Sequence, residues 1–557
     1  MKRVGILVSS TICSRYCYET IKRLSESNEI ELFFLINQKE EETQGIYKKI
    51  VSMVKQRGIF NFFSFIFFRI VTKVEYIVLS SIYSDLKKYY EVLNIDEFQK
   101  NSNIYLNPIF SKSRLSIKYS SEDIKKLESL ELDLIIRGNV GVILKGKILS
   151  VSKDGILSFH HGDNRWNRGG PAGFWEVYKR EASTGFIIQV LSEELDGGAV
   201  IFRSNIPTKR SYIENISFLY QESYPSMSNI VLKYAVEGYL AKPEKNIPYS
   251  GTILRVPTPL ETISYSIRTF FLFIRYFVNY FPLQKRDRWS VSFVKKDYKD
   301  SILRKGIEIK NPSNRFFADP FVITKGKRTI CFVEDYSYSE KLGSITAIEI
   351  FNEKEYKILG TVIKEPFHLS FPYLFEYKDE LYMVPESSKD KSIRLYKCID
   401  FPLKWEYQKN LFDDINATDS MIFEYEERWW LLFTISHTGQ NYCSELVAFY
   451  TKSDPINGKW IAHKKNPLIT DSRIARNAGI LGGGSRTVVR GRQKQGFNIY
   501  GNSLTLAEII DLTPSLFDEK EIAEINPNFF SNLKGCHHIH SDGIYTVYDY
   551  FHNKAIK

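Results

Sequence analysis

Two adjacent histidines, His160 and His161, end an apolar run and are followed at once by a polar loop. A histidine at the end of a strand can donate a hydrogen bond to a developing oxyanion or carry a proton, and it needs a carboxylate partner for this work. Asp196 is the best candidate for the partner, because it follows a strand-like run and precedes Gly197 and Gly198, which permit a tight turn. These residues predict an acid–base pair.

The loop after the histidines runs into the turn Arg168-Gly169-Gly170-Pro171. Proline suits the first turn of a helix, so Pro171 predicts a helix that begins beside the histidines. The N-terminus of such a helix would attract negative charge in a ligand.

The segments around this loop alternate between strand-like and helix-like patterns. Strand-like apolar runs occur at 3–10, 30–37, 132–139, 154–162, 184–191 and 197–208. Helix-like spacing occurs at 14–27, 120–130 and 171–182. This alternation predicts an α/β domain with a mainly parallel sheet. Ligands of such sheets bind at the C-terminal ends of the strands, which is where His160 and His161 lie.

The same residues resemble the folate-dependent formyltransferase family, which includes glycinamide ribonucleotide, methionyl-tRNA and amino-sugar formyltransferases. The family's motifs are matched in order, over about residues 130–208, by Ser158-Phe159-His160, Arg168-Gly169, Pro171, Thr184-Gly185 and Asp196-Gly197-Gly198. The resemblance implies a Rossmann-like α/β fold and transfer of a formyl group from 10-formyltetrahydrofolate to an amine. It also implies that His160 stabilises the oxyanion and that Asp196 helps to remove the amine proton.

The pattern departs from the family at Ser158, which stands in place of an asparagine. Serine offers a short hydroxyl instead of an amide donor, and loss of one oxyanion-hole donor costs about 10²–10³ in rate. Asn139 or Asn164 could substitute; otherwise the site uses modified chemistry, is weak, or is inactive. The resemblance places the folate at Gly138, Asn139, Val140, Leu191 and Glu194, and the amine substrate at Arg168 and Gly169.

From about residue 286 helical periodicity nearly vanishes, and strand–turn–strand pieces recur. These pieces start near 318, 370, 418, 482 and 535. Five repeats of about one four-stranded sheet each predict an all-β, five-bladed propeller. The last piece ends close to the final residue, so we expect it to pair with an early strand and close the ring.

This half resembles the five-bladed, glycosidase-like domain at the N-terminus of plant glucosamine inositolphosphorylceramide transferases. The matching pieces are 318–321 (ADPF), 368–372 (HLSFP), 384–387 (VPES), 490–493 and 500–501. Asp319, Glu386 and Asp419 take corresponding blade positions, where paired carboxylates could serve glycoside chemistry or could bind sugar hydroxyls and cap backbone amides. The histidines at 535–540 (GCHHIH) do not predict a metal site, because only His538 and His540 share a face.

The composition limits the partners. The net charge of +11 is spread along the chain without a basic block, so no nucleic-acid partner is predicted, although the charge could favour sugar nucleotides, phospholipid headgroups or a folate tail. Six cysteines without a CxxC pair, and a start without a signal-peptide pattern, predict a reduced, cytoplasmic protein.

The aromatic-rich segments 58–83 and 263–282 predict buried or interdomain helices, with a helix lying on a membrane surface as the alternative.

Together these patterns predict a formyltransferase-like domain over 1–255, a helical linker over 256–285 and a propeller over 286–557. The expected activity is N-formylation of an amino sugar, nucleotide- or lipid-linked, during synthesis of a surface polysaccharide or glycolipid, with the propeller binding or processing the glycan. The alternatives are a carbohydrate-active propeller with a degenerate transferase domain, and a glycan-binding protein without enzymatic activity.

Overall fold

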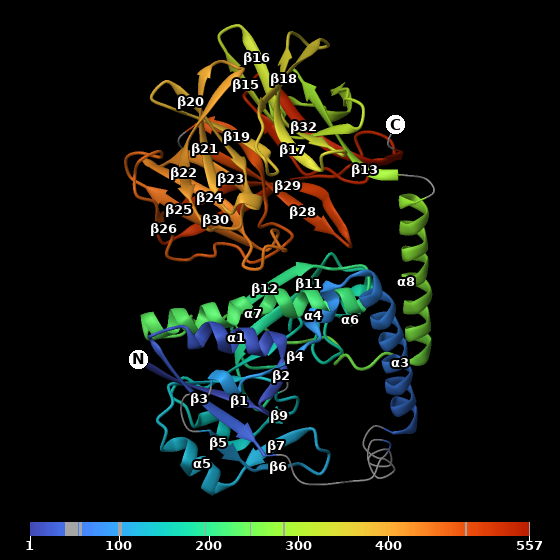
Figure 1. The fold of residues 1–557 in the computed structure, drawn as a ribbon, viewed down its shortest axis with the longest axis vertical. Helices are drawn as coiled ribbons and strands as arrows, with labels where there is room; N and C mark the ends of the chain where they lie inside the picture. The colour runs from blue at the N-terminus through green and yellow to red at the C-terminus, as the bar shows by residue number, and fades with distance from the viewer. Residues whose placement is uncertain are drawn as a thin grey trace. The chain divides into compact units, whose positions relative to one another are not determined.

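The computed structural model describes residues 1–38, 54, 58–98, 103–194, 196–245, 247–281, 285–484 and 487–555. Contacts divide the chain into two compact units, Met1–Leu272 and Phe273–Lys557 (Figure 1). The boundary falls within helix α8 (Pro259–Tyr280), which lies in the segment for which a helical linker is predicted.

A seven-stranded sheet in the order β12-β11-β10-β8-β1-β3-β5 organises the first unit. Its strands are β1 (Lys2–Val8), β3 (Ile30–Asn37), β5 (Ile104–Leu106), β8 (Leu134–Arg137), β10 (Ile156–His160), β11 (Ser183–Val190) and β12 (Ala199–Pro207). The first five run parallel, and β11 and β12 add an antiparallel edge. The predicted α/β fold with a mainly parallel sheet is confirmed.

Helices cover both faces of this sheet, which explains why its strands are continuous apolar runs. Alternate residues of β1 enter different cores. Val4 and Ile6 pack in the core that includes α1 (Arg15–Ser25) and α7 (Tyr212–Glu237), whereas Leu7 packs in the core that includes α5 (Ser121–Glu128). Smaller elements complete the unit: β2 (Ile12–Ser14), α3 (Ile59–Ile82), α4 (Asp85–Tyr89), β4 (Val92–Asn94), η1 (Asp96–Phe98), β6 (Pro108–Phe110), β7 (Ser116–Tyr119), β9 (Ile143–Leu144), η2 (Gly146–Ser150) and α6 (Phe174–Lys179).

Two helix predictions need correction. Helix α6 begins at Phe174, because its N-cap Gly173 adopts a left-handed conformation with φ of 71°, so Pro171 lies in the turn before the helix. Segments 58–83 and 263–282 do form helices α3 and α8, but only one face of each is buried, and large apolar side chains cover the other. Within the described residues, no helix has both the length and the apolar character needed to cross a bilayer.

Five four-stranded antiparallel sheets form the second unit, as predicted. They are β14-β13-β32-β31 (Ile307–Ile309, Lys285–Val294, Thr546–Ala555, Ile539–Ser541), β15–β18 (Arg315–Lys325, Arg328–Ser337, Leu342–Ile350, Tyr356–Ile363), β19–β22 (Ser370–Tyr377, Glu380–Glu386, Ile393–Asp400, Lys404–Phe412), β23–β26 (Ala417–Tyr425, Arg428–Ile435, Glu445–Thr451, Ile461–Ala462) and β27–β30 (Asn477–Gly484, Thr487–Gly496, Ile499–Leu512, Phe517–Ile525). Because β13 pairs with β32 along its whole length, the last strand of the chain closes the ring with the first, as expected.

Candidate functional site

The structure brings His160 and Asp196 together at the C-terminal end of β10. Nδ1 of His160 lies 3.2 Å from Oδ1 of Asp196, and both side chains are largely buried. Nε2 of His160 lies 2.9 Å from the backbone carbonyl oxygen of Asn167. Oδ2 of Asp196 accepts a 3.3 Å hydrogen bond from the backbone N–H of Gly169, so this residue, predicted to bind substrate, also holds the carboxylate.

The charges of this pair stabilise each other. Burial alone lowers the pKa of His160, but the hydrogen bond and charge of Asp196, together with the Asn167 carbonyl, outweigh it and raise the pKa above its usual value. Burial likewise tends to raise the pKa of Asp196, yet the hydrogen bond and charge of His160 and the N–H of Gly169 lower it overall. Both directions favour an imidazolium–carboxylate pair at neutral pH.

Both nitrogens of His160 are therefore engaged by the protein. In this arrangement the ring has no N–H left for a direct hydrogen bond to an oxyanion, which differs from the role that the family resemblance implies. The imidazolium charge can still stabilise a neighbouring oxyanion, because Coulomb attraction is strong in a site that excludes water.

Ser158 contacts the half-buried Arg137. Its hydroxyl accepts a 3.3 Å hydrogen bond from Nη1 of Arg137 and donates to the Phe159 carbonyl. Arg137 also donates to the carbonyls of Val140 and Val142, at 2.9 and 3.1 Å. Burial lowers the pKa of Arg137, while the nearby charges of Tyr16 and Asp196 oppose that shift. Sequence reasoning missed Arg137, although an arginine inside an apolar strand-like run was a visible signal.

The two asparagines named as substitutes for the family's amide have different partners. Asn139 accepts from the backbone N–H of Ser9 at 2.7 Å and donates to the Ile12 carbonyl, so it anchors the loop after β1. Asn164 donates to the backbone carbonyl of Asp196 at 3.2 Å. Of the two, Asn164 is the one that contacts the histidine–aspartate pair.

A second carboxylate extends this network. The amide nitrogen of Asn167 donates to Oε1 of Glu176 at 2.8 Å, while the Asn167 carbonyl bonds His160. Burial raises the pKa of Glu176 above its usual value. Sequence reasoning missed Glu176, because it lies in a helix-like stretch whose contact with the loop is visible only in three dimensions.

His161 packs in the core. Its ring stacks on Phe159 with centroids 5.0 Å apart and meets the edges of Tyr16 and Tyr220. Burial and the charge of His160 lower its pKa to about 3, and Nε2 lies 3.1 Å from the Ser223 hydroxyl. The side chain is neutral and has a packing role.

A cavity of about 350 Å³ adjoins the pair on the side of Asn164. Its lining includes Arg168, Arg203 and Lys245 together with Glu194, so it brings one predicted substrate residue and one predicted folate residue together. Arg168 lies over the ring of Tyr249, with its guanidinium carbon 4.6 Å from the centroid, and donates to the Asn164 carbonyl.

The other predicted folate residues have packing or backbone roles. A Cβ on Gly138 would lie 3.0 Å from Cys17 Sγ and 3.1 Å from the Leu7 carbonyl oxygen, so this glycine permits close packing of the loop. Val140 is buried, and the backbone N–H of Leu191 donates to the Ile156 carbonyl. None of these residues lines the cavity beside Asn164.

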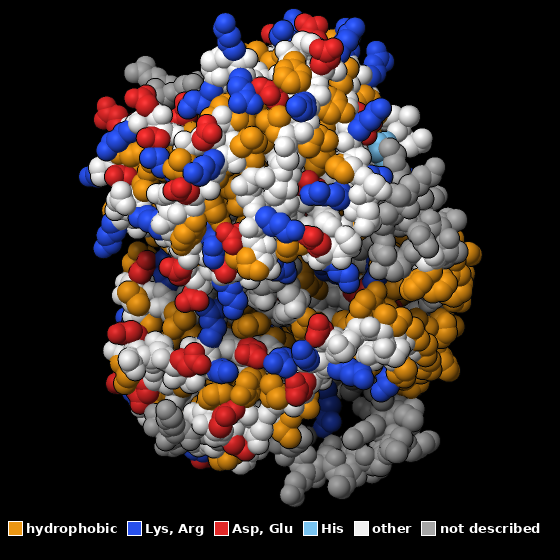
Figure 2. All heavy atoms as spheres, turned by 45° about the horizontal axis from the view of Figure 1, so that its top comes forward, with side chains coloured by type: hydrophobic (Ala, Val, Ile, Leu, Met, Phe, Trp, Pro, Cys, Tyr) orange, Lys and Arg blue, Asp and Glu red, His pale blue; other side chains and the backbone are white. Residues whose placement is uncertain are grey.

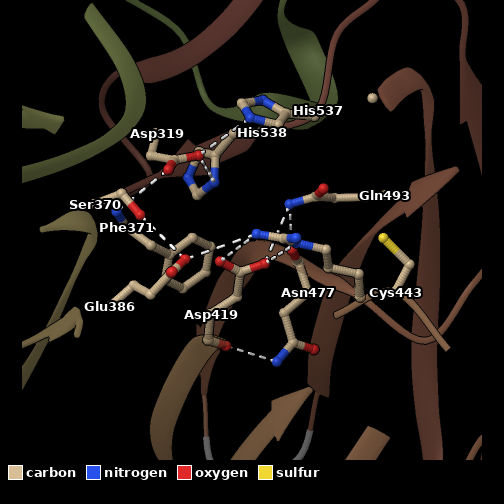
Figure 3. Close-up of polar contacts among 12 residues, drawn as sticks. Asp319, Ser370, Phe371, Glu386, Asp419, Cys443, Asn477, Gln493, His537 and His538 are labelled. Carbon is tan, nitrogen blue, oxygen red and sulfur yellow. Dashed lines mark hydrogen bonds and ion pairs between the residues drawn. The ribbon is translucent and has the colours of Figure 1, made fainter. Parts of the chain in front are cut away.

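In the second unit a guanidinium joins two of the three predicted carboxylates. Nε of Arg476 lies 2.6 Å from Oδ2 of Asp419, and Nη2 lies 3.7 Å from Oε2 of Glu386. The guanidinium carbon is 5.1 Å from the ring centroid of Tyr500. Figure 3 shows Asp319, Glu386 and Asp419 gathered in one region. Sequence reasoning missed Arg476, whose loop gave no chemical signal.

Two of these carboxylates sit on strained backbone. Asp319 and Asp419 have φ values of 48° and 51°, and each lies where the register of its inner strand shifts by a β-bulge. Left-handed non-glycine residues cost about 1–3 kcal/mol each and concentrate at functional sites. Burial raises the pKa of Asp319 to about 7 and that of Asp419 to about 6, even though His537 and Arg476 respectively oppose the shift.

Asp319, His537 and Asp549 place possible metal-ligand atoms within 4.8 Å of one another. The Asp549 carboxylate, however, accepts the backbone N–H groups of Asp319, His537 and His538, and its Oδ2 lies 2.7 Å from Nδ1 of His537. Hydrogen bonding therefore accounts for the position of Asp549, which orients the His537 ring.

Comparisons with known proteins agree with this two-part architecture. Residues 304–538 match the family model described as Glucosamine inositolphosphorylceramide transferase 1, N-terminal. Glucosamine inositolphosphorylceramide transferase 1 of Oryza sativa subsp. japonica is 34% identical over 213 residues, which are 37% of this chain and 28% of that protein. The chain thus spans less than a third of the length of the plant relatives that it matches.

The N-terminal region is weakly similar to Methionyl-tRNA formyltransferase of Trichormus variabilis, at 29% identity over 100 residues, which are 18% of this chain and 29% of that protein. Among solved structures, glycinamide ribonucleotide transformylase 1 from Symbiobacterium toebii gives a TM-score of 0.27 at 11% identity, covering 42% of this chain and 89% of its own. A family 117 glycoside hydrolase of Zobellia galactanivorans gives 0.30 at 10% identity, covering 48% and 90%. Residues 304–538 of the second unit therefore match the model of the Glucosamine inositolphosphorylceramide transferase 1 N-terminal domain, and the N-terminal region of the chain is distantly similar to formyltransferases.

Proposed function

We propose that the first unit transfers a formyl group from 10-formyltetrahydrofolate to the amine of an amino sugar. The observation that carries this proposal is the 3.2 Å contact between His160 Nδ1 and Asp196 Oδ1 at the C-terminal end of β10. The similarity of the N-terminal region to a formyltransferase supports the class of reaction.

The two side chains have separate tasks. Asp196 is the ionised partner, so its carboxylate accepts the proton that the amine loses when its nitrogen bonds to the formyl carbon, directly or through a water. The bond between the formyl carbon and the folate nitrogen then breaks, and that nitrogen takes up a proton as tetrahydrofolate leaves. His160 is the cationic partner, and its charge stabilises negative charge on the formyl oxygen. The N–H of Gly169 holds the second oxygen of Asp196 in place. Asn167 fixes the imidazole ring from the other side.

When bound, 10-formyltetrahydrofolate supplies the activated formyl group. Of the residues that the family resemblance assigns to it, Glu194 is exposed, lines the cavity beside Asn164 and offers a carboxylate to an amino-pterin N–H. Val140 is buried and Leu191 is partly buried, and neither lines that cavity, so in this proposal the folate contacts the protein through Glu194.

The cavity beside Asn164 favours an acceptor that carries phosphate. Arg168 and Lys245 line it, as does Arg203, which is paired with Asp163 and with Glu244 of the same lining. Guanidinium groups bind phosphate in bidentate fashion, and Arg168 is the one best placed to do so. A nucleotide- or lipid-linked amino sugar has both the phosphate and the free amine. The name of the plant relatives contains glucosamine, itself an amino sugar, which supports this acceptor class. We place the reaction in the cytoplasm, in the synthesis of a surface polysaccharide or glycolipid.

An assay of the full chain tests this function. With 10-formyltetrahydrofolate and a panel of nucleoside diphosphate amino sugars, tetrahydrofolate release should require the free amine. The matched control is the N-acetylated form of the same sugar nucleotide, which has no amine to formylate. Equal release with the acetylated sugar would show hydrolysis of the folate and would refute the proposed transfer.

The pH dependence of this activity follows from the histidine. Because the pKa of His160 is raised, the imidazolium persists to a higher pH than that of an ordinary histidine and is lost as the pH rises through this pKa. We expect kcat/KM to fall on the alkaline side with an apparent pKa above the usual value of 6.5. A rate that increases steadily from pH 6 to pH 9 would contradict a catalytic imidazolium.

Gly162 offers a test of how tightly the ring must be held. A Cβ at this position would lie 2.8 Å from Nε2 of His160 and 3.1 Å from the Asn167 carbonyl oxygen. Gly162→Ala should therefore displace the imidazole and lower kcat/KM by about 10²-fold. Gly141→Ala is the matched control, because a Cβ there meets nothing within 4 Å; equal losses in the two variants would argue against a positioned ring.

We infer that the second unit binds a glycan at the cluster of Asp319, Glu386, Asp419 and Arg476. The supporting observation is the strained backbone of Asp319 and Asp419, which directs charged groups to one region. The side chains of Glu386 and Arg476 are 10% and 13% exposed, which makes them the most exposed members of the cluster. Carboxylates and guanidinium groups supply the charged hydrogen bonds that sugar hydroxyls accept and donate.

A further inference from the structure

Helices α3 and α8 carry large apolar side chains on the faces that point away from the first unit. We name this surface the helical face, and its members up to the unit boundary are Phe60, Phe63, Ile66, Ile70, Val74 and Ile77 of α3, and Ile263, Ile267, Phe270 and Phe271 of α8. All of them are exposed, and Phe60 is 85% exposed. Figure 2 shows hydrophobic side chains gathered at the right, over the position of these helices.

The spacing of these residues is that of one helix face. In α3 the exposed members recur every three or four residues, and the buried Ser64, Phe68, Thr72 and Leu79 form the opposite face. The buried face of α3 packs against the rest of the first unit, whereas the face that carries the large apolar side chains is exposed. Contiguous exposed apolar surface of this kind marks an interaction site.

The inner faces fix the two helices to the same part of the first unit. The hydroxyl of Tyr265 in α8 donates to Glu75 of α3 at 2.7 Å, and Glu75 also accepts the N–H of Ile213. The ring of Phe174 lies 5.1 Å from that of Phe68 and 5.2 Å from that of Tyr265. Because the helices share these neighbours, their exposed residues belong to one surface.

The charge around the helical face is positive. Arg69, Lys73 and Arg268 are exposed on these helix segments. The acidic residues are occupied elsewhere: Glu75 is bonded on the inner side, and Glu261 accepts from both the backbone and the hydroxyl of Thr258 at the start of α8. An apolar face flanked by cations is complementary to a surface of acyl chains beneath anionic headgroups.

We infer that the helical face binds the surface of an anionic lipid bilayer, with the four phenylalanines entering the headgroup–acyl boundary and Arg69, Lys73 and Arg268 contacting lipid phosphate. Charge complementarity favours an anionic bilayer over a second copy of the chain as the partner of the helical face. Contact between two copies would bring the positive charges of their helical faces together. The chain then lies on the membrane without crossing it, and the first unit works next to lipid-linked substrates.

Co-sedimentation of the full chain with vesicles tests this inference. Binding is expected with vesicles that contain one third phosphatidylglycerol in phosphatidylcholine, and much weaker binding with phosphatidylcholine alone. Replacing Phe60, Phe63, Phe270 and Phe271 together with serine should lower the partition coefficient by at least about 100-fold. Arg69→Gln with Lys73→Gln should lower it about fivefold per charge on the anionic vesicles only.

The matched control removes exposed apolar side chains from the propeller. Ile358→Ser with Ile522→Ser alters residues that are 39% and 47% exposed and should leave vesicle binding unchanged. Circular dichroism checks that every variant folds. Equal vesicle binding by the phenylalanine variant would overturn the inference. The inference would also be overturned if light scattering showed that the wild type is a dimer and the phenylalanine variant a monomer, while neither protein co-sedimented with vesicles.

Discussion

Asp196→Asn is expected to lower kcat/KM for formyl transfer by about 10³-fold, near the middle of the range for loss of a general base. Asparagine keeps the shape of the side chain but cannot accept the amine proton. It also removes the charge that raises the pKa of His160, so the ring nitrogen next to residue 196 should lose its proton at a lower pH. Steady-state kinetics measure the first effect, and NMR titration of the histidine measures the second.

Glu193→Gln is the matched control for this variant. Glu193 is an exposed carboxylate three residues before Asp196, and its Oε1 accepts the backbone N–H of Gly146 at 3.1 Å. Its neutralisation should change kcat/KM by less than about threefold, since surface substitutions are usually within ±0.5 kcal/mol. An Asp196→Asn protein that folds, binds folate and retains more than a tenth of the activity would show that Asp196 is not the base.

Arg476→Ala is expected to lower the free energy of unfolding of the propeller by about 3–5 kcal/mol at neutral pH. The substitution leaves Asp419 without its 2.6 Å partner and Glu386 without its nearest cation, both in a buried cluster. Denaturant unfolding followed by tryptophan fluorescence reports mainly on this unit, because five of the seven tryptophans lie in it, namely Trp289, Trp405, Trp429, Trp430 and Trp460.

The loss caused by Arg476→Ala should depend on pH with a definite sign. Without the guanidinium, the already raised pKa of Asp419 rises further above its unfolded value. The folded state then binds more protons than the unfolded state, so stability falls as the pH rises. The destabilisation should be largest near pH 8 and should shrink toward pH 5.

Arg473→Ala is the control for this variant. Arg473 pairs with Asp471 on the surface and is 46% exposed, so its removal should lower the free energy of unfolding by less than about 1 kcal/mol. Equal losses in both variants would contradict a special role for Arg476.

Much of the first unit could be predicted because its central strands are continuous apolar runs bounded by polar turns. The strand β5, with three residues, was too short to produce such a pattern. Helix α7 was missed for a different reason: it contains Pro225 and buries residues on several sides, so it lacks a clear apolar stripe. In the propeller, the regular recurrence of strand pairs was enough to predict the number of blades and the closure of the ring.

The candidate sites were predictable only in part. His160 and Asp196 could be paired from sequence because each lies at the end of a strand-like run, beside a polar loop. Their strands are antiparallel, so the loop after β11, and not a shared sheet edge, brings Asp196 to the C-terminal end of β10. Arg137 interrupts an apolar strand-like run, which is a local signal, but its contact with Ser158 depends on the pairing of β8 with β10. Glu176 contacts Asn167 through the fold of the loop, and no local pattern predicts that contact. The same holds for Arg476, which reaches Asp419 from a position 57 residues further along the chain. The two bulges at Asp319 and Asp419 depend on cross-strand register, which residue types alone do not specify.

Transfer of an isotopic label tests the central proposal most directly. The full chain is incubated with 10-formyltetrahydrofolate that carries ¹³C in the formyl group and with a nucleoside diphosphate amino sugar, and the sugar is examined by mass spectrometry and ¹³C NMR. We predict a labelled formamide on the sugar nitrogen, formed by the wild type and by Glu193→Gln but not by Asp196→Asn. Label that appears only as free formate, or equal labelling by Asp196→Asn, would contradict formyl transfer at the His160–Asp196 pair.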